Sequence, residues 1–127
     1  MKRLLLLTGF VFGLMAFSYQ SSDITGVVNA FKSADATQIG SFFDEYVDIK
    51  LLDKSEVKNM GRNQATITLK TFFAENNIKG FEKLSEREMG GTMYLAGKLL
   101  DGGKGLNVTV LMKIKDGKPQ IITLRIN

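Results

Sequence analysis

The chain has 127 residues, of which 44% are hydrophobic and 24% are charged, and its formal net charge is +4 at pH 7. It contains no cysteine and no histidine. The absence of cysteine excludes disulfides, thiol nucleophiles, thiolate metal sites and a lipid-modified cysteine. The absence of histidine excludes His-dependent catalytic triads and His-rich zinc sites. A chain of this length is expected to form one domain.

Residues 1–18 have the pattern of a secretory signal peptide. Lys2 and Arg3 give a basic start, residues 4–17 form an uncharged apolar run, and the run ends in small residues up to Ser18. The alternative is a single membrane anchor, but the run is shorter than the roughly 20 residues that a bilayer-spanning helix needs. We therefore predict cleavage after Ser18.

The mature domain, residues 19–127, is then expected to be exported to a periplasm or to the outside of the cell, without a stable membrane anchor. Loss of Lys2 and Arg3 lowers the basic count from 17 to 15 against 13 acidic residues, which leaves a net charge of 15 − 13 = +2. The remaining basic residues are spread evenly, so the sequence has no electrostatic footprint for nucleic acid. We expect no nucleic-acid partner.

Two short helices are predicted at the start of the mature chain. The first has apolar residues at i, i+3, i+4 and i+7, with Ser22 and Asp23 suited to its N-terminus. This stripe consists of Ile24, Val27, Val28 and Phe31. The second helix has the same spacing and begins near Asp35, which with Gln38 resembles a capping box. Its stripe consists of Ile39, Phe42, Phe43 and Tyr46.

The sequence pattern in the middle of the chain predicts a short hairpin, followed by a segment that fits either a strand or a helix. Residues 47–52 alternate as in a strand, and residues 56–60 are expected to return beside them. In residues 63–77, threonines that alternate with apolar residues fit a strand, whereas another apolar spacing fits a helix capped by Asn63. The helical stripe consists of Ala65, Leu69, Phe72 and Phe73. Two adjacent phenylalanines break a period of two, which favours the helix.

The rest of the chain reads as strands joined by short turns. The expected strands are 81–88, 92–100, 106–115 and 120–126. Gly90-Gly91 and Asp116-Gly117 are two-residue turns, and Pro119 is tolerated only at the start of the last strand. Helices first and consecutive antiparallel strands last predict an α+β domain.

This order of elements resembles the nuclear-transport-factor-2-like (cystatin-like) superfamily. Within it, the chain is similar to a small exported domain family of unknown function common in Bacteroidetes. The segments that carry the resemblance are 30–33 through 42–44, 51–54, 70–76 and 106–127, with its ending Leu124-Arg125-Ile126. The resemblance implies a curved four-stranded meander plus a short hairpin, wrapped around three helices as a cone. It also favours a helix for residues 63–77, and it transfers no catalytic residues.

The predicted interior of the cone is rich in Met and Phe, which adapt to irregular shapes and can line a pocket for a small apolar ligand. More often such residues simply fill a core. The interior-facing set is Phe31, Phe42, Phe43, Met60, Leu69, Phe72, Phe73, Met93, Leu95, Val108, Val110 and Met112. If a pocket exists, its candidate lining residues are Phe43, Tyr46, Met60, Phe72, Phe73, Met93 and Met112.

The resemblance also raises the alternative of an isomerase- or hydratase-like enzyme, because some superfamily members use an Asp inside the cone. A general base of this kind needs a carboxylate desolvated among apolar side chains. The nearest candidates are Asp44, Glu45 and Asp48, but the sequence favours a solvated helix end for them. Since no acidic residue interrupts an apolar strand face, we assign no catalytic residue.

The other face of the strands is half polar, and in the resembled superfamily this face often pairs two subunits. Its rows are Tyr94, Ala96 and Lys98, then Thr109, Leu111 and Lys113, then Ile121, Thr123 and Arg125. An apolar patch within a polar rim suits a homodimer interface, for which the candidates are Tyr94, Leu111, Thr123 and Arg125. The alternative is a solvated face with isolated hydrophobic residues.

No metal site or cofactor is predicted, since Glu82, Glu86 and Glu88 lack further ligands to complete a metal site. The expected role is a non-enzymatic exported domain that binds a partner protein or a small apolar ligand.

Overall fold

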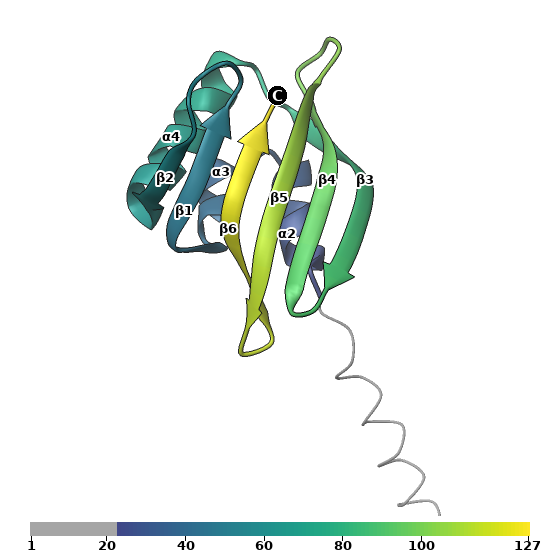
Figure 1. The fold of residues 1–127 in the computed structure, drawn as a ribbon. Helices are drawn as coiled ribbons and strands as arrows, with labels where there is room; N and C mark the ends of the chain where they lie inside the picture. Colours follow the sequence, from purple (N-terminus) through teal and green to yellow (C-terminus); the bar gives the residue numbers. More distant parts are fainter. Residues whose placement is uncertain (1–22) are drawn as a thin grey trace, which may run out of the picture.

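The computed structural model describes residues 23–127 as three helices and six strands (Figure 1). The helices are α2 (Thr25–Lys32), α3 (Ala36–Gly40) and α4 (Arg62–Glu75). The strands are β1 (Phe43–Leu51), β2 (Val57–Gly61), β3 (Gly80–Met89), β4 (Thr92–Leu100), β5 (Leu106–Lys115) and β6 (Lys118–Ile126). The predicted signal peptide and the predicted cap at Ser22 lie outside the described residues.

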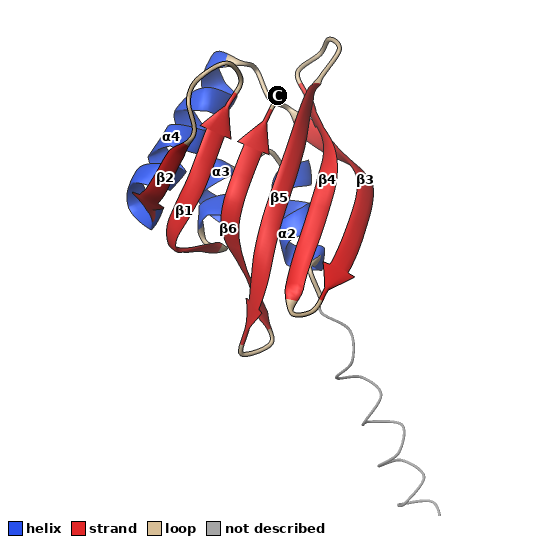
Figure 2. Cartoon of the chain, viewed as in Figure 1, coloured by secondary structure: helices blue, strands red, loops and turns tan. Residues whose placement is uncertain are grey.

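All six strands form one sheet in the order β2-β1-β6-β5-β4-β3. The strands from β3 to β6 make the predicted antiparallel meander, and β1 and β2 make the predicted hairpin. The hairpin joins the meander because β1 runs parallel to β6, with Phe43 opposite Ile121 and Leu51 opposite Ile126. The three helices pack on one face of this curved sheet (Figure 2). The predicted α+β fold is confirmed.

The two N-terminal helices begin where aspartate side chains accept their free backbone N–H groups. Asp23 Oδ1 accepts a hydrogen bond from the N–H of Thr25 at 2.9 Å. Asp35 Oδ1 accepts hydrogen bonds from the N–H groups of Thr37 at 3.0 Å and Gln38 at 3.1 Å, which confirms the predicted cap at Asp35. The capping box with Gln38 is not completed, because the backbone N–H of Asp35 donates to the carbonyl of Ala30.

The second helix is much shorter than its apolar stripe predicts. α3 ends at Gly40, so the prediction that Phe42, Phe43 and Tyr46 lie on this helix is wrong, and β1 starts at Phe43. The backbone N–H of Ile121 donates to the carbonyl of Phe42 at 2.7 Å, which draws the chain beside β6. Sheet pairing with a distant strand therefore outweighs the local helical spacing.

Residues 62–75 form the helix that the paired phenylalanines favoured. Ala65, Leu69, Phe72 and Phe73 are its buried residues, as predicted. The cap position is Gly61 rather than Asn63, so the helix starts one residue before the predicted cap.

The C-terminal strands follow their predicted bounds closely, and β4 and β5 match them fully. Gly90, Gly91, Asp116 and Gly117 all have positive φ, the conformation that two-residue hairpin turns require. Pro119 is the second residue of β6.

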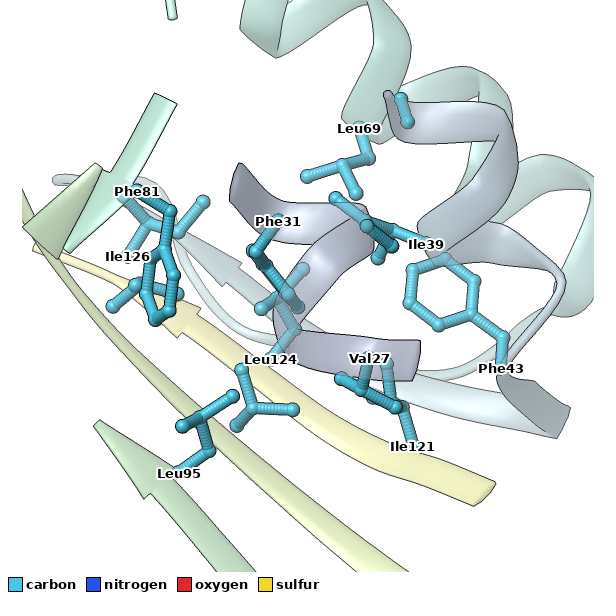
Figure 3. Close-up of a cluster of buried hydrophobic side chains, with 14 of the residues drawn as sticks. Val27, Phe31, Ile39, Phe43, Leu69, Phe81, Leu95, Ile121, Leu124 and Ile126 are labelled. Carbon is cyan, nitrogen blue, oxygen red and sulfur yellow. The ribbon is translucent and has the colours of Figure 1, made fainter. Parts of the chain in front are cut away.

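The core lies between the sheet and the helices (Figure 3). Phe31 of α2 and Phe43 of β1 are completely buried, and the ring of Phe31 packs against that of Phe81 with centroids 5.3 Å apart. Every residue of the predicted interior-facing set is buried or packs partly buried against this core. Burial of so many large apolar side chains is the main stabilising contribution to the fold.

Candidate functional site

The two faces of the sheet differ in what covers them. The inner face packs against α2, α3 and α4, whereas Figure 2 shows no helix of residues 23–127 over the other face, here called the outer face. In β4 every second residue is buried on the inner face, as are Val108, Val110 and Met112 of β5, and the residues between them point outward and are half-buried or exposed. The outer face is therefore a broad surface that the described helices leave uncovered.

The centre of the outer face is half apolar and lies on three neighbouring strands. Tyr94 of β4 pairs with Leu111 of β5, and Leu111 pairs with Thr123 of β6. These three side chains are half-buried, because each covers its neighbours on the same face. The predicted dimer-face residues Tyr94, Leu111 and Thr123 are thus in one continuous row, and Arg125 lies one row further along β6.

One residue predicted for this face is not on it. Leu111 pairs with Thr123, but Met112 pairs with Ile121, so Ile122 is an extra residue in β6 at this point of the ladder. Such a bulge reverses the alternation of the strand, and Ile121 is completely buried in the core. The prediction that Ile121 belongs to the outer face is therefore wrong.

Ion pairs flank the apolar centre. Lys113 Nζ of β5 lies 2.9 Å from Asp44 Oδ2 of β1, and Arg125 Nη2 of β6 lies 3.1 Å from Glu56 Oε1. The hydrogen bond from Lys113 holds the pKa of the Asp44 carboxyl below its ordinary value. Asp44 is therefore an ionised, paired carboxylate at neutral pH, whereas a general base needs a pKa raised toward the working pH.

The other two candidate carboxylates also lie at the surface. Glu45 is exposed, and Asp48 is half-buried and accepts a hydrogen bond from the backbone N–H of Asn59 at 2.9 Å. Among residues 23–127 no polar or charged residue is buried. No described carboxylate therefore has the desolvated setting that the enzyme alternative requires.

The candidate pocket-lining residues are distributed over the core and three separate places on the surface. Phe43, Met93 and Met112 are core residues, and Met60 packs against that core. Phe72 and Phe73, although buried, border two different surface hollows beside α4.

Tyr46 stands apart from the other candidate lining residues, because it is exposed on β1. It borders a polar hollow of about 560 Å³ at the start of α4 together with Arg62 and Lys115. Arg62 fixes one wall of this hollow, since its Nε donates a hydrogen bond to the carbonyl of Phe43 at 3.0 Å. No local sequence pattern marks Arg62 as a site residue, since its hydrogen-bond partner is nineteen positions away.

Residues 23–127 contain no group of three or more Asp and Glu residues placed to hold a metal ion. Within the same residues, no helix is long and apolar enough to cross a membrane.

The model of one protein family, a domain of unknown function (DUF4783), matches residues 24–127. A solved structure of a member from Bacteroides ovatus has 20% sequence identity and a TM-score of 0.72, and the match covers 83% of this chain and 94% of that one. A member from Bacteroides fragilis has 24% identity and a TM-score of 0.70, covering 80% and 94%. Comparison with curated proteins gave no match.

The same fold occurs beyond this family. A nuclear-transport-factor-2-like protein of unknown function from Cytophaga hutchinsonii has 12% identity and a TM-score of 0.57, covering 82% of this chain and 84% of that one. The match over nearly all described residues, together with the six-stranded sheet and its helices, shows that this chain belongs to the family of unknown function DUF4783 and has the nuclear-transport-factor-2-like fold.

Proposed function

We propose that the chain is an exported, non-enzymatic interaction domain that forms a homodimer through the outer face of its sheet. The observation that carries this proposal is the continuous row of Tyr94, Leu111 and Thr123 on the one face that the described helices leave uncovered. A half-apolar centre surrounded by charged side chains is the composition that protein interfaces favour. A second copy packed on the outer face would remove this centre from water.

The interior supports a protein partner more than a small apolar ligand. Between the sheet and the helices, the candidate lining residues Phe43 and Met112 have no exposed surface, and Met93 is 4% exposed. Side chains in such contact fill the space that a ligand would need. The outer face is then the surface left for recognition.

The oligomeric state tests the dimer directly. Size-exclusion chromatography with light scattering of the chain from residue 19 onward is expected to give twice the monomer mass. Tyr94→Glu and Leu111→Glu each bring a charge into the interface and are expected to give monomers. Lys70→Glu, on the exposed side of α4, is the matched control and is expected to remain dimeric. A wild-type monomer at high concentration would contradict the proposal.

Export is tested separately from the dimer. The basic start, the apolar run and the small residues before position 19 support a cleaved leader. N-terminal sequencing of protein recovered outside the cytoplasm is expected to begin at Tyr19. Recovery of the full-length chain from the cytoplasm alone would contradict export and leave the dimer proposal unaffected.

A further inference from the structure

The central row of the outer face carries opposite charges at its two ends. Strand pairing aligns Asp48 of β1 with Thr123, Thr123 with Leu111, Leu111 with Tyr94, and Tyr94 with Arg87 of β3. Leu111 is the middle of this row, with two strands on either side. At a strand spacing of about 4.8 Å, Asp48 and Arg87 are separated by about 19 Å along the sheet.

Resting on the homodimer proposed above, we infer that the second copy packs face to face about a two-fold axis that runs parallel to the strands near Leu111. This axis exchanges the two ends of the row. It places Asp48 of each copy opposite Arg87 of the other, and it packs Leu111 against its own copy. Charge complementarity thus selects one arrangement among those that the apolar centre permits.

The alternative two-fold axis, perpendicular to the strands, is disfavoured by the same row. It would keep each strand over its own copy and place Asp48 opposite Asp48 and Arg87 opposite Arg87. Like charges in contact suppress such an arrangement. Neither the central apolar residues nor the sheet topology alone distinguishes the two axes.

A second pair of residues fits the same axis independently of charge. Tyr46 lies two residues before Asp48 on β1, and Met89 lies two residues after Arg87 on β3. Because β1 and β3 run in opposite directions, both residues lie on the same side of the central row. They are 56% and 52% exposed, among the most exposed large apolar side chains of residues 23–127. The axis through Leu111 places Tyr46 of one copy opposite Met89 of the other.

The basic end of the row, Arg87, differs from Lys113 and Arg125, the two basic residues that flank the centre of this face. Lys113 and Arg125 have ion pairs within the chain, whereas no carboxylate of residues 23–127 lies within ion-pair distance of Arg87. The sheet curves around the helices (Figure 1), so the edges of two facing outer faces lie further apart than their centres, and the long side chain of Arg87 is needed to reach the short side chain of Asp48 in the other copy. Arg87 therefore has both the unpaired charge and the reach for a contact between copies.

Charge reversal tests this arrangement. Asp48→Lys and Arg87→Glu each replace both attractions of the dimer by repulsions, and each is expected to raise the dissociation constant about ten-fold or more. In an equimolar mixture of the two variants, each charge pair of the mixed dimer again joins an acidic and a basic side chain. Sedimentation velocity is therefore expected to show recovery of dimer on mixing.

The matched control is the pair Lys70→Glu and Glu75→Lys on the exposed side of α4, for which mixing is expected to change nothing. If the mixture of Asp48→Lys and Arg87→Glu stays as weak as each variant alone while Leu111→Glu still gives monomers, the inferred axis is wrong and the homodimer stands. If the wild-type chain is a monomer, both fail.

A second experiment leaves Asp48 unchanged and so preserves the hydrogen bond that it accepts from the backbone of β2. The chain has no cysteine, so Tyr46→Cys and Met89→Cys each introduce one thiol at an exposed position. With a short bis-maleimide, a mixture of the two variants is expected to give covalent dimers, whereas each variant alone gives few, because identical positions lie about 19 Å apart. Equal cross-linking by each variant alone would overturn the inferred axis.

Discussion

Lys113 and Asp44 form an ion pair of 2.9 Å that joins β5 to β1 across the intervening strand β6. β1 and β6 pair with an irregular register between Phe43 and Asp48, so this ion pair bridges a part of the sheet where the ladder is incomplete. It therefore helps to hold the N-terminal hairpin against the C-terminal meander.

Removal of this charge is expected to weaken the fold slightly at neutral pH. Because the side chain of Lys113 is 44% exposed, Asp44→Asn is expected to lower the free energy of unfolding by no more than about 1 kcal/mol. The pKa of Asp44 is lower in the folded chain than its ordinary value, so its stabilisation is present above the ordinary pKa and is lost as the pH falls through the lowered one. Urea unfolding of both proteins should give free energies that differ at pH 7, begin to approach each other below about pH 4, and coincide only once the pH is below the lowered pKa of Asp44. Glu45→Gln, an exposed neighbour, is the control, and a larger effect there would contradict the role of Asp44.

Close packing of β3 on β4 depends on the glycine at position 97. A Cβ atom there would clash with the carbonyl oxygen of Glu82 and with the ring of Phe81. Gly97→Ala is expected to lower the free energy of unfolding by about 1–3 kcal/mol. Gly61→Ala, where a Cβ meets no atom within 4 Å, is expected to stay within about 0.5 kcal/mol of wild type. Equal urea midpoints for the two variants would show that the strands adjust freely at Gly97.

The short helix α3 depends on its aspartate cap. Asp35 accepts two backbone hydrogen bonds at the start of a helix of only five residues. Asp35→Ala is expected to cost about 1 kcal/mol in the free energy of unfolding, and Asp35→Asn should recover most of it, because an amide oxygen can accept the same bonds. Thermal or urea unfolding of the three proteins measures this order, and an equal loss in both variants would mean that charge rather than capping matters.

Adjacent substitutions on α4 distinguish helical from strand packing by energy. Phe72 and Phe73 are 7% and 6% exposed, whereas Thr71 is exposed. Phe72→Ala and Phe73→Ala are each expected to lower the free energy of unfolding by about 3–5 kcal/mol, and Thr71→Ala by less than about 0.5 kcal/mol. A strand with one buried face would bury only one of two adjacent side chains. A large loss in the free energy of unfolding at only one of the two phenylalanines would therefore contradict the helical packing of α4.

Some elements could be predicted from the sequence because the signals that specify them are local. Val108, Val110 and Met112 alternate with polar or half-polar residues, and this period places them on the buried face of β5. The turns at Gly90-Gly91 and Asp116-Gly117 follow from the ease with which these residues adopt positive φ. The helix of residues 62–75 follows from two adjacent phenylalanines, which break the alternation expected of a strand with one buried face.

Other features were decided only by the tertiary structure. Phe43 has helical spacing from Ile39, yet it lies in β1, because its backbone pairs with β6 almost eighty residues later and this pairing satisfies polar groups that a longer α3 would satisfy in another way. The bulge at Ile122 likewise moves Ile121 from the outer face to the core, because the packing of Ile121 against Met112 and the helices stabilises the shifted register.

The outer face likewise combines features that local sequence predicts with features that only the tertiary structure decides. The alternation of polar and apolar residues within each strand predicts that Tyr94, Leu111, Thr123 and Arg125 share one face of the sheet, and strand pairing makes Tyr94, Leu111 and Thr123 neighbours on it. The placement of Asp48 and Arg87 at opposite ends of one row depends on the order of five strands, of which β1 enters the sheet by parallel pairing. A local pattern specifies which side of a strand is buried, but strand order and register are set by contacts between distant segments, which only the folded chain brings together.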